Sequence, residues 1–109
     1  MKTVYLSGKI TGSDDYKERF GEAERELRQS GYEVINPVTI PGAETMSYKD
    51  VMKECLKRVE SADYMYMLCG WAWSKGAIRE LKHFLATHNR NEYAVYFQIQ
   101  GGMPDARNL

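Results

Sequence analysis

The sequence predicts one α/β domain with three layers, in which a parallel sheet of four strands, or of five, carries helices on both faces. Four apolar, β-branched or aromatic runs alternate with three helical stretches along the chain, and this order is typical of a parallel sheet. The length of 109 residues fits one domain. Hydrophobic residues make up 43% and charged residues 28% of the chain, which is an ordinary globular composition.

The charge balance bears on partners and location. Lysine plus arginine equals aspartate plus glutamate at 15 each, whereas binding to a nucleic acid polymer or an anionic membrane needs a surplus of positive charge. We therefore expect neither as a partner. The apolar runs are too short to span a membrane, and residues 1–12 resemble a strand and a loop rather than a signal peptide, so we expect a cytoplasmic protein. Two cysteines are too few for a zinc site, and we expect no metal or cofactor.

The elements follow in order. Strands are expected at residues 3–6, 32–35, 64–68 and 93–98, within a domain of residues 1–100. Residues 101–109 are expected to form a tail or an arm toward a neighbouring subunit. Ser13 is expected to cap the first helix, and Gly31 is expected to end it. The apolar stripe of this helix comprises Tyr16, Phe20, Ala23 and Leu27.

The second helix opens with Ser47 and Asp50 at the spacing of a capping box. Its expected inner face comprises Tyr48, Val51, Cys55, Val59 and Ala62. Before it lies the longest connection, residues 37–45, and loops of this kind often cover a ligand. The third helix is expected to begin near Ser74, with Ala77, Leu81, Phe84 and Leu85 inward.

In such sheets all strand-to-helix loops emerge at one edge, where ligands bind. The first of these loops contains Gly8 and Gly12, which let a backbone approach a ligand closely. The loop matches neither the dinucleotide-binding fingerprint nor the phosphate-binding loop of nucleoside triphosphatases. Two interpretations stay open: a binding loop, or a plain turn that needs glycine.

Glu80 is the main candidate for chemistry, because its side chain leans over the turn that contains Gly76. We expect open space beside the carboxylate there, and we expect the helix N-terminus to favour the ionised form. Such a carboxylate can act as a nucleophile or an electrostatic stabiliser. The plainer interpretation is a solvated glutamate paired with a neighbouring Lys or Arg.

Trp71 and Trp73 precede this helix and are suited to stacking on a ligand or to anchoring the loop. Cys55 is expected to be a small buried hydrophobe. Cys69, at a strand end, has no nearby histidine to activate it.

Several motifs together resemble a known family. They are Tyr5-x-x-Gly8-x-Ile10-x-Gly12, Asn36-Pro37, Ala62-Asp63, Gly70-Trp71 and Ser74-x-Gly76-Ala77-x-x-Glu80, in this order. The combination resembles the nucleoside 2-deoxyribosyltransferase superfamily, in particular its small branch akin to the deoxynucleoside-monophosphate N-hydrolases, over nearly the whole chain.

The resemblance implies a flavodoxin- or Rossmann-like fold and cleavage or transfer at the N-glycosidic bond of a (deoxy)nucleoside or its monophosphate. Glu80 would be the nucleophile, Ser74 would help to hold the phosphate, and the chain would form a homodimer or a higher homo-oligomer. The candidate catalytic residues are thus Glu80, Tyr5 and Glu54. The candidate substrate-binding residues are Ser7, Gly8, Lys9, Ile10, Gly12, Trp71, Ser74 and Gly76.

The chain departs from the family pattern at two places. Cys55 stands where the family's helix aspartate is expected, with Glu54 beside it, and Cys69-Gly70 stands where transferases carry another aspartate. An acid that protonates the departing base contributes roughly 10²- to 10⁴-fold in rate. A non-catalytic module that binds or sequesters a nucleotide is therefore the alternative. Cleavage of a dinucleotide such as NAD is a third reading, with less support because the dinucleotide fingerprint is missing.

Overall fold

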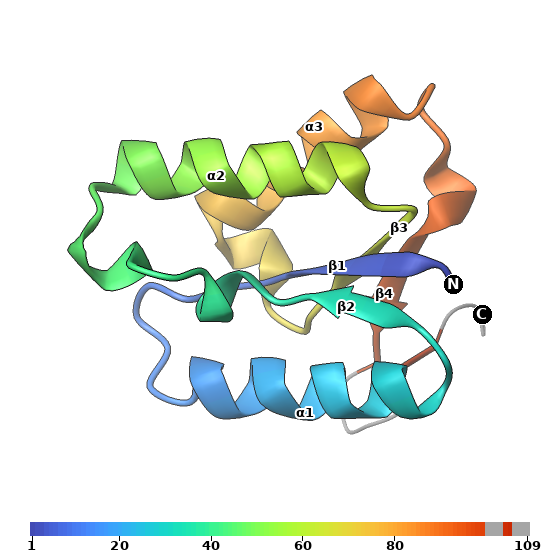
Figure 1. Cartoon of the computed structure of the whole chain (residues 1–109), viewed down its shortest axis with the longest axis horizontal. Helices are drawn as coiled ribbons and strands as arrows, with labels where there is room; N and C mark the ends of the chain where they lie inside the picture. The colour runs from blue at the N-terminus through green and yellow to red at the C-terminus, as the bar shows by residue number, and fades with distance from the viewer. Residues whose placement is uncertain (100–103, 106–109) are drawn as a thin grey trace.

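The structure, a computed structural model, describes residues 1–99 and 104–105. Helix α1 covers one face of a central sheet, and helices α2 and α3 cover the other (Figure 1). The principal elements are β1 (Thr3–Ser7), α1 (Tyr16–Gln29), β2 (Glu33–Ile35), α2 (Tyr48–Ser61), β3 (Tyr64–Met67), α3 (Lys75–Thr87), β4 (Val95–Gln98) and β5 (Pro104–Asp105). Among these residues no helix is long and apolar enough to cross a membrane.

The sheet has the strand order β2-β1-β3-β4-β5. The first four strands are parallel to one another, which confirms the predicted flavodoxin-like α/β fold. The fifth strand is antiparallel to β4, so the expectation of a parallel fifth strand is wrong. A parallel strand needs a crossover of about a dozen residues, and only residues 99–103 separate β4 from β5. Of the predicted tail, the remaining residues lie outside the described part of the chain.

Strand alternation divides the core between the two faces of the sheet. Val4 and Leu6 pack with Phe20 under α1, whereas Tyr5 and Met65 pack on the opposite face under α2 and α3. Ser7 is two residues after Tyr5 and is also fully buried. Strand β1 therefore presents the Tyr5 and Ser7 hydroxyls together toward α2 and α3.

The helix ends follow the sequence signals with one exception. The hydroxyls of Ser47 and Ser74 accept hydrogen bonds from the backbone N–H groups of Asp50 and Ala77, each at 3.1 Å, and so cap α2 and α3. The predicted Ser13 cap of α1 is wrong, because Asp15 is the N-cap and makes no side-chain cap bond. The Ser13 hydroxyl instead donates to the Asp15 carboxylate at 3.1 Å.

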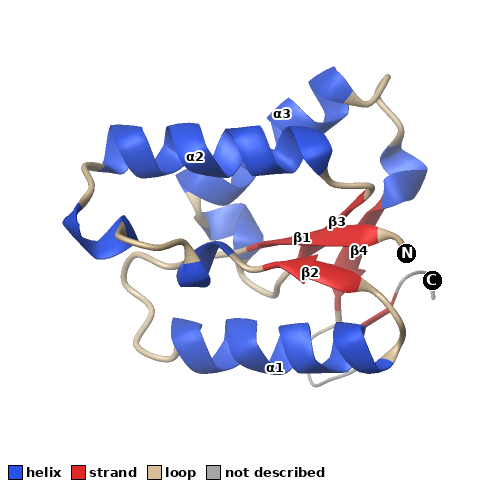
Figure 2. Ribbon diagram, in the orientation of Figure 1, coloured by secondary structure: helices blue, strands red, loops and turns tan. Residues whose placement is uncertain are grey.

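The inner face of α2 differs from the expectation at two positions. Met52 is buried together with Cys55 and Val59, although Met52 was not predicted to lie inward. Tyr48 was predicted inward but is 61% exposed. The first turns of α2 extend past the ends of the strands (Figure 2), so Tyr48 has no sheet beneath it to cover it.

Glycine at the end of α1 gives a matched pair of stability predictions. Gly31 has φ of 96°, and its N–H bonds to the Arg28 carbonyl at 3.0 Å in the capping turn. Gly31→Ala is expected to lower the free energy of unfolding by about 1–2 kcal/mol, because L-residues are strained there. Gly21→Ala, in the interior of α1 with open space around its Cα, is expected to raise it by about 0.5–1 kcal/mol.

Urea unfolding of both variants checks the pair. Two changes of the same sign would contradict the assigned backbone conformations.

Candidate active site

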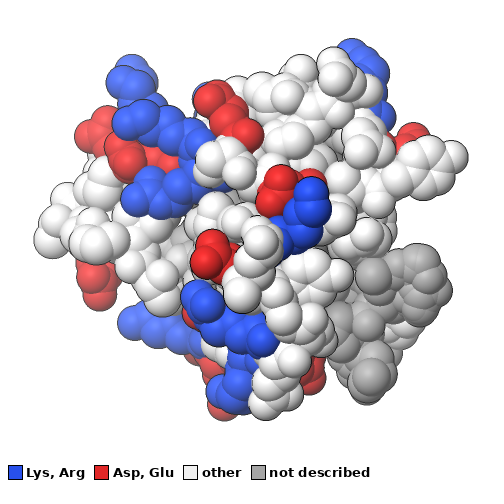
Figure 3. Space-filling model, turned by 45° about the vertical axis from the view of Figure 1, so that its right-hand side comes forward, with Lys and Arg blue, Asp and Glu red and all other residues white. Residues whose placement is uncertain are grey.

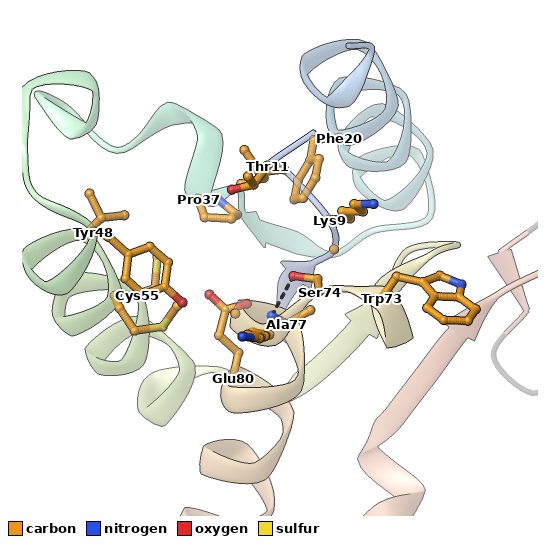
Figure 4. A pocket seen from close by; sticks show the side chains of 16 residues that line it. Lys9, Thr11, Phe20, Pro37, Tyr48, Cys55, Trp73, Ser74, Ala77 and Glu80 are labelled. Carbon is orange, nitrogen blue, oxygen red and sulfur yellow. Dashed lines mark hydrogen bonds between the residues drawn. The ribbon is translucent and has the colours of Figure 1, made fainter. Parts of the chain in front are cut away.

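A cavity of about 480 Å³ opens at the carboxyl end of β1. Its walls come from the β1–α1 loop, the first half of α2 and the start of α3 (Figure 4). This is the edge where parallel α/β sheets bind ligands, and the volume is within the range of small-molecule sites. Most of the wall is apolar, with side chains such as Phe20, Val51 and Met52.

Glu80 lies on the cavity wall although it is only 6% exposed. The Tyr5 hydroxyl donates to its Oε2 at 2.8 Å, and the Ser7 hydroxyl donates to its Oε1 at 2.6 Å. Each carboxylate oxygen therefore has its own donor from β1. A buried carboxylate fixed in this way has one orientation toward the cavity, which distinguishes Glu80 from a solvated helix glutamate.

Burial raises the pKa of Glu80 above its usual value, and the hydrogen bonds from Ser7 and Tyr5 act in the opposite direction. The sequence-based expectation that the helix N-terminus would favour the ionised form therefore misses the larger influence, which is desolvation. Burial also raises the pKa of Tyr5 well above its usual value. The Tyr5 phenol therefore stays protonated and remains a donor to the carboxylate.

Cys55 is buried as predicted, and it also lines the cavity. Tyr5 and Glu80 both lie close enough to this thiol to influence its pKa. Burial is the main cause that raises the pKa of this thiol to about 11. The position where the resemblance expects an aspartate thus does face Glu80, but it presents a neutral group.

Glu54 lies outside the cavity lining and is not brought to Glu80. Its carboxylate accepts a hydrogen bond from Arg58 at 2.9 Å and lies 3.6 Å from the Lys57 ammonium. One residue along a helix is a rotation of about 100°. Because Cys55 points into the site, its neighbour Glu54 points away.

Gly76 serves close packing between α2 and α3. A Cβ on it would lie 3.2 Å from the Met52 methyl carbon and 3.5 Å from the Tyr48 hydroxyl. The space expected beside Gly76 is therefore taken up by two side chains of α2. Ser74 lies at the same end of α3, where it caps the helix and lines the cavity.

The β1–α1 loop is held by close contacts at its base. A Cβ on Gly8 would be 3.0 Å from the Leu68 Cβ, so this glycine allows the loop to pack against the end of β3. Arg19 donates to the Lys9 carbonyl at 3.2 Å and to the Cys69 carbonyl at 3.4 Å. The sequence analysis did not identify Arg19. Its spacing of four residues from Asp15, with which it forms a salt bridge, could have indicated this residue.

The two tryptophans take different roles. The Trp71 ring packs against Phe97 with ring centroids 5.5 Å apart and lies outside the cavity lining, so it anchors the loop. Trp73 lines the cavity and is 82% exposed. Of the predicted substrate-binding residues, the cavity lining includes Gly8, Lys9, Ile10, Ser74 and Gly76, whereas Ser7, Gly12 and Trp71 lie outside it.

Charges of both signs are interspersed on the face drawn in Figure 3. Among the residues that the structure describes, Lys9 and Lys75 are the cationic side chains that line the cavity. Within residues 1–99 and 104–105, no three His, Cys, Asp or Glu side chains converge to hold a metal ion.

Comparison with known proteins bears out the fold. A solved 2-deoxyribosyltransferase from the psychrotolerant bacterium Bacillus psychrosaccharolyticus is similar, with a TM-score of 0.61 and 24% identity. The match covers 78% of this chain and 66% of that chain. This chain therefore spans just under two thirds of the length of the 2-deoxyribosyltransferase. No curated protein sequence matches the chain. Residues 2–91 match the family described as a domain of unknown function (DUF4406), and the chain belongs to that family.

Proposed function

We propose that this protein cleaves the N-glycosidic bond of a (deoxy)nucleoside or nucleoside monophosphate, with Glu80 as the nucleophile. The observation that carries the proposal is the Glu80 carboxylate on the cavity wall, held by the hydroxyls of Tyr5 and Ser7. A fixed, partly desolvated carboxylate can attack an anomeric carbon. The fold similarity to a 2-deoxyribosyltransferase supports the same class of substrate.

The reaction proceeds in two steps. A Glu80 oxygen forms a bond to the anomeric carbon while the bond from that carbon to the base nitrogen breaks, and its electron pair leaves with the base. Water then adds to the anomeric carbon of the glycosyl ester, and the ester bond breaks to restore the carboxylate. A second base in place of water gives transfer instead of hydrolysis.

The cavity suits a ligand with an apolar face and an anionic end. Val51 and Trp73 offer apolar surface for a base or a sugar ring, and Lys9 and Lys75 offer positive charge. A volume of about 480 Å³ fits a nucleoside monophosphate better than a larger dinucleotide.

A second candidate is a module that binds a nucleotide without cleaving it. It is favoured by one observation: Glu80 is the only carboxylate among the described residues that line the cavity. The Cys55 thiol stands where the resemblance to the nucleoside 2-deoxyribosyltransferase superfamily implies an acid, and it is a weak proton donor because burial raises its pKa to about 11.

Incubation with each common deoxynucleoside and ribonucleoside monophosphate, followed by chromatography of the free base, tests the proposal. Release of base from at least one of them is expected. A nucleotide that raises the melting temperature but is recovered intact would overturn catalysis in favour of the binding module.

Tyr5→Phe tests the role of the donors to Glu80. The variant keeps the ring but removes the hydroxyl that donates to Oε2. Loss of this bond loosens the orientation of the carboxylate toward the anomeric carbon, so kcat is expected to fall by about 10- to 100-fold. Loss of the donor also raises the pKa of Glu80 further, so the acidic limb of the pH–activity profile should move to higher pH. An unmoved limb would contradict the assigned role, even if kcat fell.

A further inference from the structure

Tyr48 has an unusual position on the cavity wall. It is the first residue of α2, it lines the cavity, and it remains 61% exposed. The Ser47 cap fixes the helix end that carries it. A large aromatic side chain is thus held at the site although it contributes little to the buried core.

The Tyr48 hydroxyl lies near the start of α3. It is 3.5 Å from the position that a Cβ on Gly76 would take. Glu80 is one helical turn further along α3, and its side chain leans back over the turn of Gly76. In Figure 4 the Tyr48 ring extends from α2 toward the Glu80 carboxylate. The Tyr48 hydroxyl and the Glu80 carboxylate therefore lie on adjoining parts of the cavity wall.

The proposed cleavage needs a proton for the departing base, and few groups on the described cavity wall can supply it. Glu80 is engaged as the nucleophile. Cys55 is almost completely buried, and the Ser74 hydroxyl caps α3. Lys9 lies on the opposite side of the cavity from Tyr48 in Figure 4, and both Lys9 and Lys75 are assigned above to the anionic end of the ligand.

The direction of departure also favours Tyr48. The nucleophile and the leaving group lie on opposite faces of the anomeric carbon. A base that departs from the sugar therefore moves away from the buried Glu80 carboxylate toward the open side of the cavity. Tyr48, the first residue of α2 and 61% exposed, is a hydroxyl-bearing side chain on the solvent-exposed part of the cavity wall.

We propose that Tyr48 is a catalytic residue whose hydroxyl donates the proton to the departing base; this inference rests on the proposed function. As the bond between the anomeric carbon and the base nitrogen breaks, its electron pair moves onto the base, which takes the phenolic proton. In the second step the phenolate takes a proton from the attacking water, and the ester bond to Glu80 breaks. Both side chains then return to their starting states, and the net reaction consumes one water.

Tyr48→Phe separates this role from simple packing, because it keeps the ring and removes the proton. The variant is compared with wild type on a nucleoside monophosphate that wild type cleaves, and on the 4-nitrophenyl glycoside of the same sugar phosphate, whose 4-nitrophenolate departs without a proton. A fall in kcat of about 10²-fold or more is expected on the nucleotide, with less than about a 3-fold fall on the nitrophenyl substrate. Tyr93→Phe is the matched control, since Tyr93 is 85% exposed and lies outside the cavity lining.

The outcomes distinguish the two proposals. Equal losses on both substrates, or no loss on the nucleotide, would overturn the role of Tyr48 and leave the proposed function intact. A wild-type protein that releases base from no nucleotide would overturn the proposed function itself.

Discussion

Replacing Glu80 with glutamine is expected to abolish base release and, at the same time, to stabilise the folded protein. Glutamine keeps the size of the side chain and can still accept a hydrogen bond from Tyr5 or Ser7, but it cannot form a glycosyl ester through a carboxylate. Loss of a nucleophile typically lowers kcat by about 10⁴-fold or more. An activity that survives the substitution would contradict the assignment of Glu80.

The gain in stability follows from the raised pKa of Glu80, which burial causes. Between the pKa of the unfolded chain and the higher pKa of the folded protein, the folded state holds a proton that the unfolded state has lost. The free energy of unfolding therefore falls as pH rises through this interval. Glu80→Gln removes this ionisation, so the variant should exceed wild type in stability by an amount that grows with pH and then levels off.

Urea unfolding of both proteins over a series of pH values, from acidic to mildly alkaline, measures this difference. The matched control is Glu54→Gln, because the Glu54 carboxylate is solvent-accessible and pairs with Arg58. That pair lowers the pKa of Glu54, so its substitution should have the opposite sign. A Glu80→Gln variant that is less stable than wild type at every pH would contradict the burial argument.

The activity of wild type should depend on the same ionisation. The nucleophile must be ionised, so kcat is expected to fall as pH drops through the raised pKa of Glu80. The site thus combines two opposed requirements. Burial directs the carboxylate into the cavity and away from bulk water, and the hydroxyls of Tyr5 and Ser7 offset part of the cost of ionising it there.

The sequence predicted the layers of the fold and the sheet edge at which the cavity lies, because those depend on local patterns. Alternation of apolar runs with helical stripes predicted the parallel strands, and the spacing of Ser74, Gly76 and Glu80 placed the carboxylate near the start of α3. Those signals lie within one element, where side-chain direction follows from helix or strand geometry. The hydrogen-bond donors to Glu80 belong to a different element, β1. The resemblance identified Tyr5 as a motif residue, but it did not predict the hydrogen bond from Tyr5 to Glu80.

The wrong predictions concern side chains whose burial does not follow from the periodicity of their own helix or strand. Tyr48 shares a helix face with Cys55 and Val59, but the end of α2 extends past the sheet and leaves this ring exposed. Trp71 and Trp73 are two residues apart in a short turn, and only the packing of Trp71 on Phe97 decides which one faces the cavity. A pattern within one segment cannot specify how far that segment extends over its neighbours.

Phe84→Ala is expected to cost the largest share of stability among single substitutions on α3. Phe84 is fully buried, and it lies one turn after Glu80 on the helix face that packs against the sheet. Its ring also stacks on His88 with ring centroids 3.8 Å apart. Truncation of a buried phenylalanine costs about 3–5 kcal/mol, against a total of about 5–15 kcal/mol for a typical domain.

Urea unfolding at one pH measures the loss, and Tyr93→Ala serves as the control. Tyr93 is 85% exposed, so its truncation should change the free energy of unfolding by no more than about 0.5 kcal/mol. A loss below about 1 kcal/mol for Phe84→Ala would mean that other contacts hold α3 against the sheet. The same helix carries the Ser74 cap and Glu80. The position of the Glu80 carboxylate in the cavity therefore depends on the packing of the Phe84 ring against the sheet.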